Sequence, residues 1–190
     1  METQITDNEL IQRVANKDSK ALEILYDKYS PVLFTLIKKI IGDKINAEVV
    51  LADVFVIIWQ KNELYDFNTN NFYSWLILLA RNKSIDFIKR KHGEITDEYT
   101  DEYENQFIIP KISSEIAPLE IDKAFEKRDI IYSAVNNLTE AQQYVLSLAY
   151  YEGLNETEIA EKLNIPLLTV RTKLRVVLNS IKEHLIKEDN

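Results

Sequence analysis

The chain has 190 residues, with 23 Lys and Arg against 31 Asp and Glu, a formal net charge of -8 and a pI of about 4.9. Three glycines and four prolines supply few of the residues that tight hairpins need, so the composition argues against an all-β fold. The absence of cysteine excludes a disulfide scaffold, a Cys-ligated zinc site and a thiol nucleophile. At first sight the net charge also argues against a nucleic-acid binder, because phosphate contacts need positive surface.

Neither a targeting segment nor a transmembrane helix is expected. The N-terminal stretch METQITDNEL is polar and lacks the apolar core of a signal peptide. The most apolar windows, 49–59 and 75–80, are far shorter than the roughly 20 residues that a membrane span needs. The sequence therefore predicts a cytoplasmic protein without membrane insertion.

The negative charge is concentrated in one segment. The net charge is +1 over residues 1–92, -7 over 93–129 and -2 over 130–190. The middle segment begins GEITDEYTDEYENQ, contains two prolines and shows no sustained helical period before about Leu119. It is predicted to be an acidic linker that joins a domain at 1–92 to a domain at 130–190.

The first domain is predicted to contain four helices. The first begins at the capping box Thr6-x-x-Glu9. The second begins at about Ser19, and Pro31 is expected to kink it or to restart it. Two further helices complete the domain, at about 45–61 and 71–91.

The second domain is predicted to contain a helix-turn-helix. Two capping boxes, Thr139-x-x-Gln142 and Asn155-x-x-Glu158, open its first two helices. Asn164 is able to adopt the left-handed conformation in the turn before the last helix. The apolar residues of that helix are expected to share one side, namely Val170, Leu174, Leu178 and Ile181. The predicted fold class is therefore all-α, with two helical domains.

The opposite side of the last helix is polar and basic. Residues 166–182 contain four basic residues and no acidic one. The second helix of such a motif enters the major groove, so these side chains are DNA-binding candidates. They are Leu168, Arg171, Thr172, Arg175 and Asn179. A solvated polar face on a packed helix fits the spacing equally well.

A second basic cluster lies near the end of the first domain. Residues 81–92 contain five basic side chains and the single acid Asp86, and three aromatic residues lie just upstream. Basic side chains beside exposed aromatic rings suit single-stranded nucleic acid. In the alternative interpretation, Asp86 and Arg90 form an ion pair between successive turns and most of the rings, including Phe72 and Trp75, lie in the core. We favour core positions for about two thirds of the rings.

No catalytic or metal-binding constellation is apparent in the sequence. His92 and His184 have no patterned partner, and there is no Gly-rich phosphate loop. The carboxylates of residues 97–104 lack the glycine and the spacing of a calcium loop. We expect a protein that is not an enzyme and that needs no cofactor or metal.

Two stretches resemble a known family. FYSWLILLARNKSIDFIKRKH (72–92) resembles the promoter-melting segment of bacterial sigma factors of the sigma-70 family, extracytoplasmic-function (ECF) group. LTEAQQYVLSLAYYEGLNETEIAEKLNIPLLTVRTKLRVVL (138–178) resembles the C-terminal helix-turn-helix of the same group. The resemblance implies an alternative sigma factor that binds core RNA polymerase and directs promoter-specific transcription initiation, with a region 2-like domain followed by a region 4-like domain.

The resemblance also implies partners and roles for individual residues. Domain 1–92 would bind the β′ clamp helices of the polymerase, mainly through Glu48, Val49, Asp53 and Trp59. It would also melt the -10 element, beside which would lie Asn70, Asn71, Arg81, Asn82, Lys83, Lys89, Arg90 and Lys91. Domain 130–190 would read the -35 element with the last helix and meet the β flap. An anti-sigma factor is a further implied partner, and the acidic linker would mimic nucleic acid in the RNA-exit path.

The sequence departs from the family at three places. Val49-Val50-Leu51-Ala52-Asp53 replaces an Asp-Leu-Val-Gln-Glu-like run, Asn164 replaces a common glycine, and Val176 replaces a basic residue. The first departure leaves open a helix-turn-helix regulator that does not bind polymerase. A protein-binding helical module, such as a decoy for an anti-sigma factor, is a third hypothesis.

Overall fold

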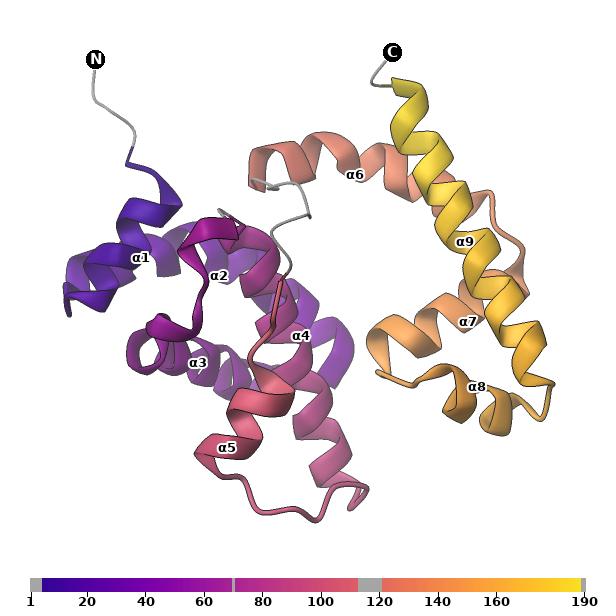
Figure 1. Cartoon of the computed structure of the whole chain (residues 1–190), viewed down its shortest axis with the longest axis horizontal. Coiled ribbons are helices and arrows are strands. Elements are labelled where there is room, and N and C mark those ends of the chain that lie inside the picture. Colours follow the sequence, from indigo (N-terminus) through magenta and orange to yellow (C-terminus); the bar gives the residue numbers. More distant parts are fainter. Residues whose placement is uncertain (1–4, 70, 113–120, 189–190) are drawn as a thin grey trace. The chain divides into compact units, whose positions relative to one another are not determined.

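The computed structural model describes residues 5–69, 71–112 and 121–188, and in these residues every regular element is helical (Figure 1). The chain divides into two compact units, one ending at Leu119 and the other beginning at Glu120. Each unit has its own buried core. The predicted all-α fold with two helical domains is therefore confirmed.

The first unit is built around its second helix. Its four long helices are α1 (Asp7–Ala15), α2 (Ser19–Ile41), α3 (Lys44–Gln60) and α4 (Phe72–Lys91). Helix α2 packs against each of the other three, so its apolar side faces the middle of the bundle. Tyr29, Leu33 and Ile37 on this side are wholly buried. The short turns η1 (Asn62–Leu64) and η2 (Phe67–Thr69) connect α3 to α4.

Local signals set the ends of these helices. The capping box at Thr6 and Glu9 is present in both directions, as predicted. Asp18 caps α2 by accepting hydrogen bonds from the backbone N–H groups of Lys20 and Ala21. Pro31 does not restart the helix, since α2 is continuous from Ser19 to Ile41. The buried side of α2 holds it against three helices, and this packing outweighs the hydrogen bond that a proline cannot donate.

The segment 93–129 differs from the single linker that its composition predicts. Helix α5 (Asp101–Tyr103) and the π-helical turn η3 (Glu104–Ile108) belong to the first unit, where Ile108 and Ile109 are buried. At the other end, α6 (Ile121–Asn136) belongs to the second unit. The part of the segment in the first unit folds because it carries aromatic and apolar residues among its acids. These residues pack on side chains of α4. Residues 113–120 lie outside the described residues.

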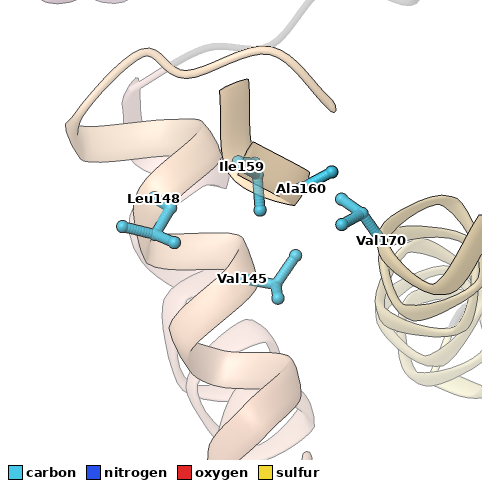
Figure 2. Close-up of a cluster of buried hydrophobic side chains, with 5 residues drawn as sticks. All are labelled: Val145, Leu148, Ile159, Ala160 and Val170. Carbon is cyan, nitrogen blue, oxygen red and sulfur yellow. The ribbon is translucent and has the colours of Figure 1, made fainter. Parts of the chain in front are cut away.

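The second unit is a helix-turn-helix, α8 and α9, with two helices before it. After α6 come α7 (Glu140–Tyr151), α8 (Glu156–Leu163) and α9 (Leu167–Glu188). Both predicted capping boxes are present, and Asn164 has a φ of 50° in the left-handed region. Helix α9 packs against α6, α7 and α8. Figure 2 shows the core between the last three helices, formed by Val145, Leu148, Ile159, Ala160 and Val170.

One predicted core position of α9 is wrong. Leu178 is 63 % exposed, whereas its neighbour Val177 is wholly buried. Seven residues separate Val177 from Val170, which places the two side chains about 20° apart around the helix, while Leu178 is about 80° away. Helix α9 packs against α6 as well as against α7 and α8, and the sequence analysis did not identify α6.

Candidate nucleic-acid and polymerase interfaces

The DNA-binding candidates of α9 form one exposed surface. Leu168, Arg171, Thr172, Arg175 and Asn179 are all exposed. Val170 and Val177 are wholly buried on the other side of the helix, so the packing fixes which side faces solvent. The left-handed turn at Asn164 sets the start of α9 relative to α8. This arrangement presents the first turns of α9 outward, as a helix that enters a major groove requires.

Two of these candidates are held by neighbours within the motif. Arg171 Nε lies 2.7 Å from Glu156 Oε2, which joins α9 to the first turn of α8. The Thr172 hydroxyl donates to the Leu168 carbonyl at 2.8 Å. Both side chains of the ion pair are largely exposed, and such pairs contribute little to stability. The pair therefore orients the Arg171 side chain at the surface but contributes little to the stability of the unit.

The basic side chains of α4 are less exposed than those of α9. The side chains of Lys83 and Arg90 are 12 % and 24 % exposed, and only Lys91 is an exposed residue. Arg81, Asn82 and Lys89 are half-buried. The Asn82 amide donates to the Ile108 carbonyl at 3.1 Å, which shows that part of the cover comes from the returning segment after α4.

Asp86 and Arg90 form the ion pair that their spacing predicts. Arg90 Nε lies 3.0 Å from each carboxylate oxygen of Asp86. Burial alone would lower the pKa of Arg90, but the charge of Asp86 and its hydrogen bond raise it above the ordinary value. The Tyr103 hydroxyl also donates to Asp86, at 2.7 Å, and burial together with this contact raises the pKa of Tyr103.

The aromatic residues at the start of α4 are mostly core residues. Phe72 and Trp75 are buried, and Tyr73 is half-buried and stacks on Tyr29 with ring centroids 5.9 Å apart. Tyr65 is buried too, where its hydroxyl donates to Asn8 and accepts from the Asn71 N–H. Phe72 and Trp75 therefore do not offer a stacking platform for unpaired bases, in agreement with the core interpretation.

Of the two asparagines proposed for the -10 element, Asn71 is not exposed at the surface. Asn71 is wholly buried before the first turn of α4. Asn70 lies outside the described residues. Burial therefore argues against Asn71 as a DNA contact, and the prediction for the other candidates of this unit is unchanged.

Helix α3 carries an exposed apolar row. Ile45, Val49 and Val56 are exposed, and Ala52 lies between them at helical spacing. Glu48, exposed beside Val49, pairs with Lys44 at 3.7 Å. Ile45 and Val56 were missed as candidates, although the spacing of four, three and four residues was visible in the sequence.

The other two polymerase-binding candidates of α3 lie at the edges of this row. Asp53 lies 3.4 Å from Lys83 on α4, so part of its charge is compensated within the unit. Trp59 is half-buried, and Lys17 Nζ lies 5.2 Å above its ring. The four candidates thus do not form one patch of equal exposure: Glu48 and Val49 are exposed, and Asp53 and Trp59 are partly covered.

Two family models match the chain, one on each unit. The model described as Sigma-70 region 2 matches residues 25–94, and the model described as Sigma-70, region 4 matches residues 128–176. Two models of one family in this order, on separately folded units, decide the assignment. The chain belongs to the sigma-70 family.

Curated relatives place this sigma factor in the ECF group. It is 24 % identical over 174 residues to the ECF RNA polymerase sigma factor SigK of Mycolicibacterium vanbaalenii, covering 92 % of this chain and 86 % of that protein. It is also 24 % identical over 173 residues to SigK of Mycobacterium tuberculosis, covering 91 % and 90 % respectively. It is therefore an alternative sigma factor, which binds core RNA polymerase and directs promoter-specific transcription initiation.

Two solved structures align with most of the chain at low identity. One is CnrH in complex with the cytosolic domain of CnrY, at 16 % identity and a TM-score of 0.42, covering 97 % of this chain and 99 % of that one. The other is Rhodobacter sphaeroides SigE in complex with the anti-sigma ChrR, at 22 % identity and a TM-score of 0.48, covering 96 % and 99 %.

The described part of this sigma factor contains no group of three or more His, Cys, Asp or Glu residues that could hold a metal ion. Among the same residues, no helix is long and apolar enough to cross a membrane. Functional candidates that the sequence analysis missed lie after α4. Tyr99 contacts Lys83 of α4, Tyr103 lies against Arg90, and Glu104 accepts a hydrogen bond from the Tyr99 hydroxyl. The spacing of Tyr99, Tyr103 and Phe107, four residues apart, was the available signal.

Proposed function

We propose that this sigma factor divides its work between its two units. The unit at 121–188 would read the -35 element through α9. The unit at 5–112 would bind core polymerase through α3 and hold the melted -10 element along α4. The observation that supports this division best is the exposed surface of α9, with two arginines opposite a wholly buried valine row.

The proposed -35 contact rests on the chemistry of that surface. Arginine makes paired hydrogen bonds to the major-groove edge of guanine, and a hydroxyl or an amide can serve other bases. Arg171 and Arg175 are one helical turn apart, so both can face the same groove. Val176 stands where the family has a basic residue; it is 42 % exposed and adds no phosphate contact. Arg171 and Arg175 would therefore supply the positive charge of the exposed surface defined above.

The proposed polymerase contact rests on the apolar row of α3. A row at spacings of three and four residues is the pattern by which a helix docks against another helical partner. The Val49–Asp53 departure from the family fits an apolar docking surface on α3. Val50 and Leu51 are buried in the unit, and Val49 and Ala52 are exposed. The contact would therefore be more apolar than the family pattern predicts.

The remaining proposals follow from membership of the family. The polymerase, not this chain, would perform the chemistry, so we expect no catalysis, cofactor or metal of the chain's own. We also expect it to work in the cytoplasm with RNA polymerase. An anti-sigma factor remains a predicted partner, and the solved SigE structure contains one, ChrR.

Run-off transcription with bacterial core polymerase on a promoter library tests the proposal. We expect transcripts only when the chain is added, from promoters that share a -10 and a -35 element. Replacing Arg175 by Ala should change the choice of -35 sequence, and replacing Val49 by Asp should weaken core binding at every promoter. A chain that binds duplex DNA but is not retained by core polymerase would support the helix-turn-helix regulator and overturn the proposal.

A further inference from the structure

The acidic segment after α4 turns back and lies against the basic side of that helix. Three of its residues, Tyr99, Tyr103 and Glu104, contact side chains that the family resemblance assigns to DNA, or contact each other. We call these three residues the clasp. Three following residues, Ile108, Ile109 and Pro110, are buried, and we call them the anchor.

The anchor fixes the segment to the core of the unit. Trp75 Nε1 donates to the Pro110 carbonyl at 3.1 Å, and this contact is buried. The Asn82 amide donates to the Ile108 carbonyl at 3.1 Å. Apolar burial and two hydrogen bonds to backbone carbonyls hold the anchor on the core of the unit.

The clasp is more polar and covers Lys83. The Lys83 ammonium donates to the Tyr99 hydroxyl at 2.8 Å and lies 4.1 Å from the centre of that ring. The Tyr99 hydroxyl in turn donates to Glu104 at 2.8 Å. Tyr99 is nevertheless 37 % exposed, so water reaches this contact. Lys83 is thus covered by an aromatic ring and a neutral hydroxyl, with Asp53 at 3.4 Å on its other side.

The clasp also covers Arg90. The guanidinium centre lies 4.5 Å from the Tyr103 ring and 5.1 Å from the Tyr99 ring. Arg90 Nη1 donates to the Asp97 carbonyl at 2.6 Å. Arg90 Nη2 is buried and has no hydrogen-bond partner within the described part of the chain. A buried N–H group without a partner is unfavourable, so a phosphate oxygen or water would satisfy Arg90 better than the closed clasp does.

A third cation, Lys61, compensates the negative charge of Glu104 in the clasp. Its ammonium lies 2.8 Å from Glu104 and 2.9 Å from Asp101. Lys61 follows the last residue of α3 and is not one of the basic residues of α4. The carboxylate of Glu104 therefore stays compensated whether or not Tyr99 remains on Lys83.

We propose that the clasp is an autoinhibitory contact: Tyr99 and Tyr103 occupy Lys83 and Arg90 in the free sigma factor and must lift for a DNA strand to reach them. This rests on the proposed function, in which α4 holds the melted -10 element. A row of phosphates offers Lys83 and Arg90 full negative charges in place of neutral hydroxyls and rings. The anchor keeps the segment in place while the clasp lifts, so release does not require the unit to unfold.

The test compares the wild-type chain with an open variant, Tyr99→Ala together with Tyr103→Ala. Binding of a fluorescein-labelled, mixed-sequence single-stranded DNA is followed by fluorescence anisotropy over a range of salt concentrations. Two regained phosphate contacts should tighten binding on the order of tenfold at low salt and steepen the salt dependence by about 0.7 per contact. Equal affinity and equal salt dependence in the two proteins would overturn the proposal.

Two lysine variants separate this proposal from the function on which it rests. Lys83→Gln should weaken DNA binding more in the open variant than in the wild-type chain, because in the wild-type chain Lys83 must give up its contact with Tyr99 to bind DNA. Lys91→Gln is the matched control, since Lys91 is exposed and outside the clasp, and it should weaken binding equally in both. If Lys91→Gln weakens binding while opening the clasp has no effect, only the autoinhibition is wrong. If neither lysine matters in either background, the DNA-binding role of α4 is wrong.

A measurement on the wild-type chain covers the case in which the open variant does not fold. The Glu104 N–H donates to the Thr100 carbonyl and the Ile109 N–H donates to the Glu104 carbonyl. Hydrogen exchange of the Glu104 amide should accelerate when the single-stranded DNA is added at saturation, while the Trp75 indole N–H, which donates to the anchor at the Pro110 carbonyl, keeps its rate. Slower or unchanged exchange at Glu104 would mean that DNA binds with the clasp closed.

Discussion

Arg171 on α9 and Glu156 on α8 form an ion pair at 2.7 Å across the two helices of the helix-turn-helix. Arg175, one turn further along α9, is exposed, and the structure shows no ion pair for it within the described residues. The two arginines therefore differ in their contacts before DNA binds. Arg171 must exchange a carboxylate for DNA, whereas Arg175 can approach DNA directly.

Replacing Arg175 by Ala should weaken binding of a -35 promoter fragment by about 1–3 kcal/mol, the usual value of a base-edge contact. Replacing Arg171 by Ala should cost less, because its ion pair with Glu156 is lost at the same time. Electrophoretic mobility shift with the duplex fragment measures both. Arg128→Ala on α6 removes the same charge from an exposed position and serves as the control. Equal losses for Arg175→Ala and Arg128→Ala would show that the effect is general charge, not recognition by α9.

Replacing Val177 by Ala should destabilise the second unit by about 2 kcal/mol, because it removes two buried carbon atoms and leaves a cavity. Replacing Leu178 by Ala on the same helix should change the free energy of unfolding by less than about 0.5 kcal/mol, since Leu178 is largely exposed. Chemical denaturation followed by circular dichroism measures both. A larger loss for Leu178→Ala would restore the core assignment that the sequence favoured.

The sequence predicted best the features that depend on a few neighbouring residues. The capping boxes at Thr6, Thr139 and Asn155 were identified from four residues each, because both partners lie within one helical turn. The last helix shows the limit of such patterns. Val177 and Leu178 are adjacent and equally apolar, and only the position of α6 decides which of them is buried.

The cover over α4 could not be predicted in this way. Tyr103 meets Asp86, and the Pro110 carbonyl meets Trp75, across 17 and 35 residues of chain. In the sequence the same segment is a run of acids with two prolines, which is typical of a linker. Its few aromatic and apolar residues find their partners on α4, so composition alone did not show that part of the segment folds onto the first unit.

Asn164 offers a test of the turn between α8 and α9. Its φ of 50° costs little for asparagine and less for glycine, but a β-branched residue is strained there. Asn164→Gly should leave the free energy of unfolding of the second unit within about 0.5 kcal/mol of wild type, and Asn164→Val should lower it by about 1–2 kcal/mol. Thermal unfolding of both variants measures this. Asn164→Val should also weaken -35 binding, because the turn sets the start of α9.

The apolar row of α3 leads to a prediction for polymerase binding. Val49→Asp places a charge in the proposed contact and should raise the Kd for core polymerase on the order of tenfold, or about 1.4 kcal/mol. Ile24→Asp makes the same change at an exposed isoleucine of α2 and is the matched control. Surface plasmon resonance with immobilised core enzyme compares them. If both variants bind as the wild type does, the row is not the docking surface.

The last prediction concerns the alkaline limit of the first unit. Burial, the hydrogen bond to Glu104 and nearby carboxylates raise the pKa of Tyr99 well above its ordinary value. Because the unfolded chain ionises this tyrosine near pH 10 and the folded chain does not, the contribution of Tyr99 is fully present below about pH 10 and is lost as the pH rises further. The free energy of unfolding of the first unit should therefore fall above about pH 10. Tyr99→Phe should flatten this decline, and Tyr26→Phe, at an exposed position of the same unit, should leave it in place. Urea unfolding across alkaline pH measures the slopes, and identical slopes for Tyr99→Phe and wild type would contradict the closed clasp.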